Sequence, residues 1–267
     1  MFEHFRAHTI VHVKFLARSR VLLGFAVLIA LWSAIGLVPA FFLGTTANRF
    51  ELLKGVAQQL HGTASTITSC LGLAILWSHR RSRTIKMVAT KPSSFEGWVA
   101  SIFVAAGIVG LTVHTVVALL TIVGSWYWAV PYQNGFLYVA ADYFVQSVIV
   151  LACLTAMSAI VHPVLAVLTL IVFNESTIKF LGIVVAGASD AGARGPVMRA
   201  ASAVLSGLYY IVPSFSPFEH HTQELYRSLR ATTTDWRYLA AAAGYASLIC
   251  ALGYFTTVVV LRRRQLT

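Results

Sequence analysis

Long apolar stretches, separated by short polar segments, run through this chain of 267 residues. A membrane-spanning helix needs roughly 20 mainly apolar residues, and six stretches meet this requirement. They lie at residues 21–43, 59–77, 95–124, 136–160, 163–187 and 238–261. The alternation typical of barrel strands is absent, and backbone polar groups cannot stay unpaired in hydrocarbon, so helices are expected. The pattern therefore predicts an all-α membrane protein with six transmembrane helices, folded as one domain over residues 1–267.

The composition supports a membrane location. Hydrophobic residues make up 58% of the chain and charged residues only 11%, whereas a soluble domain carries roughly 25% charged residues. We therefore expect a multi-pass protein of the plasma or inner membrane. The three cysteines, Cys70, Cys153 and Cys250, fall in different predicted spans without paired spacing. This arrangement argues against a disulfide framework or a zinc site, and no metal site is predicted.

The distribution of Lys and Arg predicts the topology, because basic residues near the ends of spans prefer the cytoplasm. With both termini inside, the cytoplasmic segments hold twelve basic residues and the external segments seven, while Lys179 lies within a span. The long segment 188–237 between the fifth and sixth spans is then an external loop, and residues 78–94 are cytoplasmic. Contacts of these basic residues with anionic headgroups account for most of the net charge of +11, so no nucleic-acid partner is expected.

The connection between the second and third spans reads SHRRSRTIKMVATKPSSFEGW and concentrates positive charge between two apolar stretches. Its centre can form about two helical turns, in which Met87 and Val88 are apolar residues among the bases. Pro92 ends this segment, and Glu96 suits the first turn of the helix that follows. A short helix of this kind at the membrane face suits a docking partner. Membrane anchoring alone is the alternative explanation of its charge.

Four segments occur in an order that is typical of one family. The basic connection carries Arg83-Thr84, Met87, Val88, Thr90-Lys91-Pro92 and Ser94; the N-terminus reads HFRAHTIVHVKFLARSRVLLGF; residues 208–219 read LYYIVPSFSPFE; and the chain ends in YFTTVVVLRRRQL. This order resembles that of the membrane subunits of ABC-2-type exporters, including an interfacial helix over residues 1–20. Many members carry an acidic residue before the Arg/Gly-Thr step, where this chain has Ser78-His79-Arg80-Arg81-Ser82.

The resemblance implies a permease subunit that is not itself an enzyme. Such subunits pair with a second copy or a related permease, and separate ATPase subunits that bind ATP and Mg drive them by docking on the loop between spans two and three. The sequence contains no G-x-x-x-x-G-K-[ST] phosphate loop, so the chain itself is expected to bind no cofactor and to hold no catalytic residue. The resemblance assigns the ATPase-coupling role to residues of the 78–94 loop: Arg80, Arg81, Arg83, Thr84, Met87, Val88, Lys91 and Pro92.

The predicted fifth span contains three polar residues within an apolar stretch, Asn174, Glu175 and Lys179. Glu175 and Lys179 are four positions apart, so they share one helix face and can pair. Charges at membrane depth are costly and usually face a protein interior or a water-filled path. The sequence therefore allows two roles for these residues, one on the translocation path or dimer seam and one as a pair that only fixes helix packing.

Two histidine-rich segments are further candidate sites. His4, His8 and His12 recur every four residues, which could form a metal stripe, but an interfacial helix with its polar face toward headgroups is favoured. The segment PFEHHTQE carries four polar side chains that a metal-assisted hydrolase could use, without the H-E-x-x-H order. These are Glu219, His220, His221 and Glu224.

Three alternatives to the exporter subunit remain at this point. A secondary transporter could use Glu175 as a proton or ion site, and would be expected to show inverted internal repeats. The others are a membrane enzyme that uses the PFEHHTQE cluster and a scaffold without transport activity. The substrate class of an exporter stays open among lipid, drug, peptide, glycan and ion.

Overall fold

The structure is a computed structural model that describes residues 2–19, 24, 27, 31, 49–81, 95–130, 134–172, 175–190, 196–228 and 232–265. These residues are almost entirely helical and contain no strand, which confirms the all-α prediction for this part of the chain. The first predicted span, 21–43, lies outside the described residues apart from three single positions, and residues 82–94 of the predicted coupling loop lie outside them completely.

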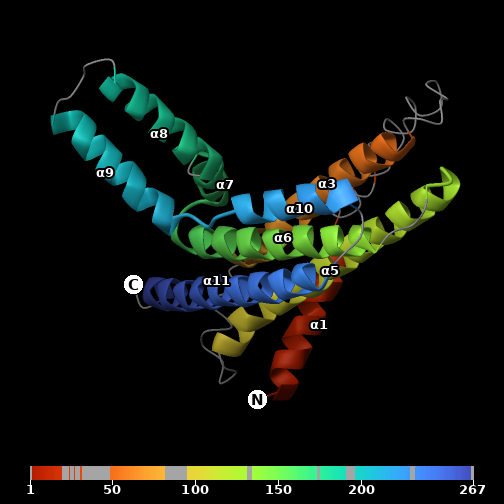
Figure 1. Cartoon of the computed structure of the whole chain (residues 1–267). Coiled ribbons are helices and arrows are strands. Elements are labelled where there is room, and N and C mark those ends of the chain that lie inside the picture. Colours follow the sequence, from red (N-terminus) through yellow and green to blue (C-terminus); the bar gives the residue numbers. More distant parts are fainter. Residues whose placement is uncertain are drawn as a thin grey trace.

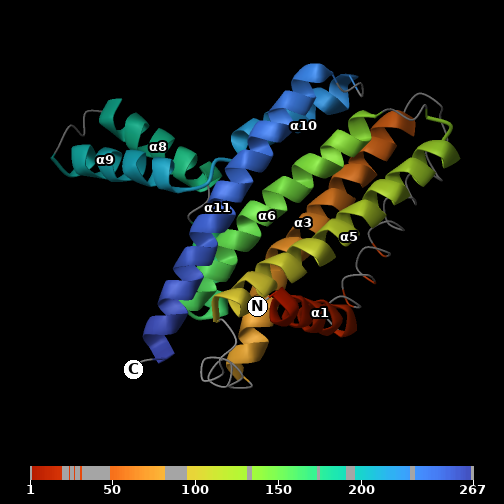
Figure 2. The same ribbon diagram turned by 90° about the horizontal axis from the view of Figure 1, so that it is seen from below.

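Four long helices lie side by side and form a bundle (Figures 1 and 2). They are α3 (Arg49–Arg81), α5 (Phe95–Tyr127), α6 (Gly135–Ile160) and α11 (Thr233–Gln265). Each is long and apolar enough to cross a membrane, since roughly 20 residues at 1.5 Å per residue span the hydrocarbon. The architecture is therefore consistent with a multi-pass membrane protein.

The predicted fifth span is broken. It consists of α7 (Pro163–Val172) and α8 (Glu175–Asp190), with a bend of 47° between them. The described residues thus contain four candidate spans, or five if the bent pair counts as one, and the prediction of six is not confirmed. The boundary before α7 follows from its proline, because a residue that precedes proline disfavours the helical region. Val161, just after α6, is extended.

Most described residues of the predicted external segment 188–237 form helices, and its external position stays a prediction. These helices are α9 (Pro196–Ile211) and α10 (Ser216–Ser228). Pro196 opens α9 and Pro217 lies in the first turn of α10, positions at which the missing N–H and fixed φ of proline favour a helix start. α8 and α9 pack on each other and lean away from the bundle, while α10 lies along α6 (Figures 1 and 2).

One end of the bundle gathers the end of α3, the start of α5 and the ends of α6 and α11, and α1 (Phe2–Arg18) crosses the bundle there (Figure 2). The largest apolar core lies in this half and includes Leu16, Ile75 and Trp98. α11 approaches α6 closely, because a Cβ added at Gly253 would lie 2.9 Å from the carbonyl oxygen of Ala152. Glycine therefore permits this helix contact.

We expect this end of the bundle to face the cytoplasm, because most of the basic residues cluster there. In a background without the three native cysteines, a cysteine at Ser82 should react with a membrane-impermeant maleimide only after the membrane is opened. A cysteine at Gln223, an exposed position on α10, should react in intact cells. Gln223 suits this test better than the neighbouring Thr222, which is buried. Labelling of Ser82 from outside would reverse the predicted orientation.

Candidate functional site

The N-terminal helix α1 is fastened to α3 and α5 by a buried histidine. His12 is 1% exposed, and its Nε2 lies 3.0 Å from Nε2 of His79. Its Nδ1 lies 3.0 Å from Oγ of Ser101, and that hydroxyl donates to the carbonyl of Trp98 at 2.6 Å. Because the hydroxyl proton is used by Trp98, His12 donates through Nδ1 to Ser101 and accepts from His79 through Nε2.

The sequence predicted that the histidine face of the N-terminal helix points toward the lipid headgroups, and for His12 this prediction is wrong. His4 is exposed as expected, but His12 faces the bundle and not the headgroups. Thr9, His12 and Leu16 form the buried stripe of α1, with the spacing of one helix face. The interfacial helix is therefore docked on the ends of two candidate spans.

Acidification should loosen α1. Burial, together with the nearby His79 and His8, lowers the pKa of His12 from 6.5 to about 4, although the hydrogen bond with Ser101 acts in the opposite direction. Because the folded pKa lies below the unfolded one, this docking contributes its full stability above pH 6.5 and loses it as the pH falls toward 4. A proton on Nε2 of His12 would also point at the N–H group that His79 donates, so their hydrogen bond would be lost.

Hydrogen exchange of the α1 amides, corrected for the intrinsic rate, measures this effect. Exchange should be faster at about pH 5 than at about pH 7, since half or more of an unperturbed histidine is charged at the lower value. His12→Phe keeps an aromatic ring against Trp98 and should remove the pH dependence. His4→Phe, at an exposed position, is the matched control and should retain it. Equal protection of α1 at both pH values in the unmodified chain contradicts the prediction.

Arg80, one of the predicted coupling residues, lies in the last turn of α3 and holds the end of α6. Its guanidinium donates to the carbonyls of Ser158, Ala159 (2.6 Å) and Val161 (3.5 Å). Carbonyl groups in the last turn of a helix lack partners within that helix and carry the negative end of its dipole, so an arginine there is stabilising. Arg81 is exposed. Arg83, Thr84, Met87, Val88, Lys91 and Pro92 lie outside the described residues.

A second set of polar contacts joins α5 and α11 at the same end of the bundle. Arg262 forms an ion pair and a hydrogen bond with Glu96, and the hydroxyl of Tyr254 donates to the Glu96 carbonyl at 3.4 Å. Together with Arg80 and His12, this pair links α1, α3, α5, α6 and α11 at the end from which the basic connection departs. A displacement of that connection would therefore be transmitted to all five helices.

The predicted pair in the fifth span forms, with Lys179 Nζ 2.7 Å from Glu175 Oε1. The structure adds a partner that the sequence did not indicate. The Glu175 carboxylate accepts hydrogen bonds from the backbone N–H groups of Phe215 and Ser216 (3.0 Å for Ser216) and from the hydroxyls of Ser214 (3.4 Å) and Ser216. These donors lie at the N-terminus of α10, where a helix favours negative charge. Glu175 thus fastens α10 to the break between α7 and α8, and Asn174 lies outside the described residues.

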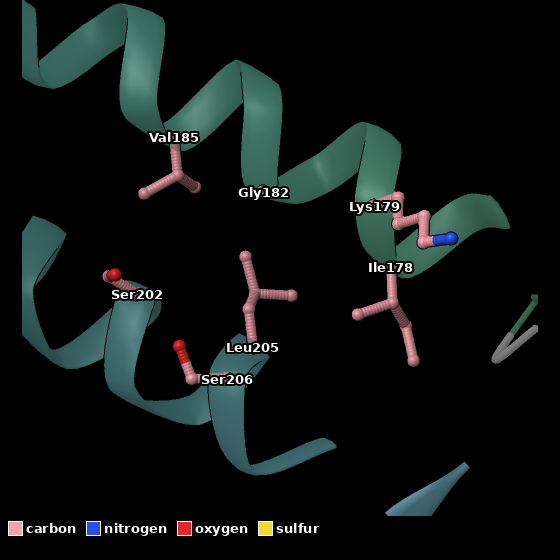
Figure 3. A pocket seen from close by; sticks show the side chains of 7 residues that line it. All are labelled: Ile178, Lys179, Gly182, Val185, Ser202, Leu205 and Ser206. Carbon is pink, nitrogen blue, oxygen red and sulfur yellow. The ribbon is translucent and has the colours of Figure 1, made fainter. Parts of the chain in front are cut away.

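A groove of about 320 Å³ lies between α8 and α9, with Lys179 at one end of it (Figure 3). The α8 side of the groove is lined by Ile178, Gly182 and Val185. The α9 side is lined by Leu205 and two small polar residues, Ser202 and Ser206. In Figure 3 the ammonium group of Lys179 points away from the centre of the groove. It donates to the hydroxyl of Ser216 at 2.5 Å.

The polar residues of PFEHHTQE do not converge on one point. His220 and Glu224 pair at 3.3 Å on the exposed side of α10, whereas His221 is buried and contacts Asp142 on α6. In the part of the chain that the structure describes, no group of three or more His, Cys, Asp or Glu side chains could hold a metal ion. The hydrolase alternative therefore has no assembled ligand set here.

Sequence reasoning missed Asp142, which is fully buried in α6. A usable signal was present, because Asp142 is an acidic residue within an otherwise apolar span, and such residues mark candidate functional positions. Its partner His221 could not be assigned from sequence, since 79 positions separate the two residues. Asp235, which contacts the other ring nitrogen of His221, is 93 positions away from Asp142.

Comparison of the chain with protein-family models, with curated proteins and with solved structures found no match.

Proposed function

We propose that the chain is the membrane-spanning permease subunit of an ABC-2-type ATP-driven exporter. The observation that carries the proposal is the packed unit of α1, the end of α3 and the start of α5, held by His12, His79 and Trp98. The basic connection that resembles the family's ATPase-docking loop leaves and re-enters the bundle at this unit. A docking loop at such a place would act on rigidly connected helices.

In this proposal the chain performs mechanical work and the partner performs the chemistry. Two permease copies, or this chain with a related permease, assemble with two ATPase subunits that bind ATP and Mg. Closure of the ATPases moves the connection between α3 and α5, and the ties through Arg80 and Glu96 carry the movement to α6 and α11. Substrate then leaves toward the external side through the seam between the permeases.

The contacts of Glu175 argue against a secondary transporter that uses this residue as its ion site. Four donors of the 214–216 segment and Lys179 occupy the two oxygens of that carboxylate. A carboxylate with this many partners is suited to fastening α10, and an ion that bound there would have to displace them.

Purification from native membranes tests the proposal. The tagged chain, extracted in mild detergent, should bring with it a separate polypeptide that a photoreactive ATP analogue labels, and excess ATP should prevent the labelling. A variant with residues 83–91 replaced by a Gly/Ser segment of equal length is the matched control and should lose that polypeptide. Recovery of a folded chain with no nucleotide-binding partner, under conditions that preserve a known exporter complex, contradicts the proposal.

A further inference from the structure

Buried polar atoms without hydrogen-bond partners gather in one region of the bundle. In the described part of the chain there are seven such side-chain atoms: both ring nitrogens of His61, Thr68 Oγ1, His114 Nδ1, Asp142 Oδ1 and the hydroxyls of Tyr226 and Tyr238. They lie on α3, α5, α6, α10 and α11. Buried polar groups in proteins are nearly always paired with protein or with internal water. Their concentration here indicates a hydrated region.

At the centre of this region a histidine lies between two carboxylates. His221 Nδ1 is 2.5 Å from Asp142 Oδ2, and His221 Nε2 is 3.1 Å from Asp235 Oδ1. Thr222 donates to the same Asp142 oxygen at 3.3 Å. Since both ring nitrogens face acceptors, both must carry a proton, and His221 is an imidazolium when the two carboxyl groups are ionised.

Asp142, His221 and Asp235 form a triad whose negative charges outnumber its positive charge. Two carboxylates and one imidazolium leave one negative charge, and Asp142 is fully buried. Among the described residues, no other cationic side chain forms an ion pair with either carboxylate. The second oxygen of Asp235 is satisfied by Thr232, the residue before α11, but Oδ1 of Asp142 has no partner. An uncompensated buried charge is costly, and such a group is neutralised by protonation in preference to remaining charged.

Polar and titratable side chains surround the triad, and Lys54 on α3 lies over the Tyr226 ring, 5.9 Å from its centroid. The Tyr238 ring lies 4.0 Å from the His221 ring, and the Tyr143 ring stacks on His61 at 5.3 Å. Further polar and titratable side chains line the triad and the region of unpartnered polar atoms around it. The long helices contribute His61 (α3), His114 (α5), Tyr143 and Ser147 (α6) and Tyr238 (α11), and α10 contributes Glu219, Thr222 and Tyr226.

We propose that this region is a proton-binding site, in which Oδ1 of Asp142 takes up a proton and internal waters occupy the remaining unpartnered atoms. The step is a simple protonation. A proton from the aqueous phase adds to the free oxygen, the carboxylate becomes a carboxylic acid, and the triad changes from one net negative charge to neutral. His221 keeps both of its protons and its hydrogen bonds to Asp142 and Asp235. Asp235, which is 17% exposed, provides the side from which the proton enters.

A metal ion does not fit this arrangement. His221 and Asp142 are in direct hydrogen-bond contact, so an ion between them would have to break that contact. The stacked rings of His61 and His114, 14° from parallel, do not direct their nitrogens toward a common point. The site therefore differs from the metal site that the PFEHHTQE segment suggested, and it requires no ATPase partner.

Infrared titration of the purified chain in lipid nanodiscs tests the proposal. Between about pH 5.5 and 8, exposed carboxyl groups with ordinary pKa values near 4 are ionised, so a carboxylic-acid C=O band in this range reports a buried carboxyl group. We expect the unmodified chain to show such a band and Asp142→Asn to lack it. Glu51→Gln, at a carboxylate that is 64% exposed, should leave the band unchanged. Absence of the band from the unmodified chain, or its persistence in Asp142→Asn, overturns the proposal.

A second variant keeps the test decisive if Asp142→Asn fails to fold. His221→Gln removes the imidazolium, whose positive charge favours the ionised form of Asp142. The titration of the band should then move to higher pH by about 1–3 units. A shift to lower pH, or no shift, overturns the assignment. A transition that follows the Na⁺ concentration at fixed pH would also overturn it, since it would identify a metal-cation site and not a proton site.

Discussion

Met87→Asp, and independently Val88→Asp, should abolish recovery of the proposed ATPase partner with this chain. Apolar anchors at the centre of an interface usually dominate its energy, whereas charges at the rim mainly tune the rate of association and the salt dependence. Loss of one such anchor costs about 2 kcal/mol or more, which corresponds to a roughly 30-fold weaker complex. Both variants should still insert, because the sequence predicts a cytoplasmic connection outside the hydrocarbon. The measurement is the amount of ATPase recovered per membrane-inserted chain.

Arg81→Ala is the charge control for this experiment. Arg81 is exposed, so its removal should weaken the complex less than Met87→Asp, and mainly at low salt, where its charge is least screened. Arg80 is unsuitable as this control, because its guanidinium holds the last carbonyls of α6 and its loss would disturb the bundle. If the connection only anchors the helices, the ranking reverses and both Asp variants retain the full amount of ATPase.

The second large effect is expected at Glu175. Glu175→Gln places an amide where the N–H groups of Phe215 and Ser216 need an acceptor, and it leaves Lys179 without its carboxylate. Removing one partner from a buried charged network typically costs on the order of 3 kcal/mol. Lys179→Met should cost less than about 1 kcal/mol, since the Lys179 side chain is 45% exposed and exposed pairs contribute little. Thermal unfolding of the purified variants measures both effects.

The double variant Glu175→Gln with Lys179→Met separates two roles of the carboxylate. If Glu175 mainly neutralises Lys179, the double variant should regain the stability of the unmodified chain. If it mainly fastens α10, the donors of residues 214–216 keep only one neutral acceptor oxygen in place of a carboxylate, and the double variant should stay as unstable as Glu175→Gln. We expect the second result. Cleavage by added protease within residues 212–216 should also increase in both Glu175 variants and remain unchanged in Lys179→Met.

The spans that were located best from sequence are those with polar residues at both ends. The predicted spans 95–124 and 136–160 correspond to α5, Phe95–Tyr127, and α6, Gly135–Ile160. The span predicted at 59–77 belongs to a helix that begins ten residues earlier, at Arg49. Its first turns carry Glu51 and Lys54, which pair with each other at 3.5 Å. Hydropathy marks the apolar length of a helix, but a polar extension stabilised by such pairs is invisible to it.

The buried polar contacts could be predicted only in part. The pairing of Glu175 with Lys179 follows from helical spacing alone, and the structure confirms it. The second partner of Glu175 is about 40 positions away, and the contacts of Arg80 and Asp142 join residues 78 to 81 positions apart. Neither periodicity nor local propensity carries information about such distant pairs. His12 was misassigned for the same reason, because its partners lie on α3 and α5.

Native mass spectrometry of the complex purified from its own membranes most directly tests the claim that a separate ATPase drives this chain. We predict a particle with two permease chains and two copies of a nucleotide-binding polypeptide, from which Met87→Asp removes only the nucleotide-binding copies. A folded chain that transports its substrate in sealed vesicles without ATP, and whose mass contains no nucleotide-binding polypeptide, would contradict this function.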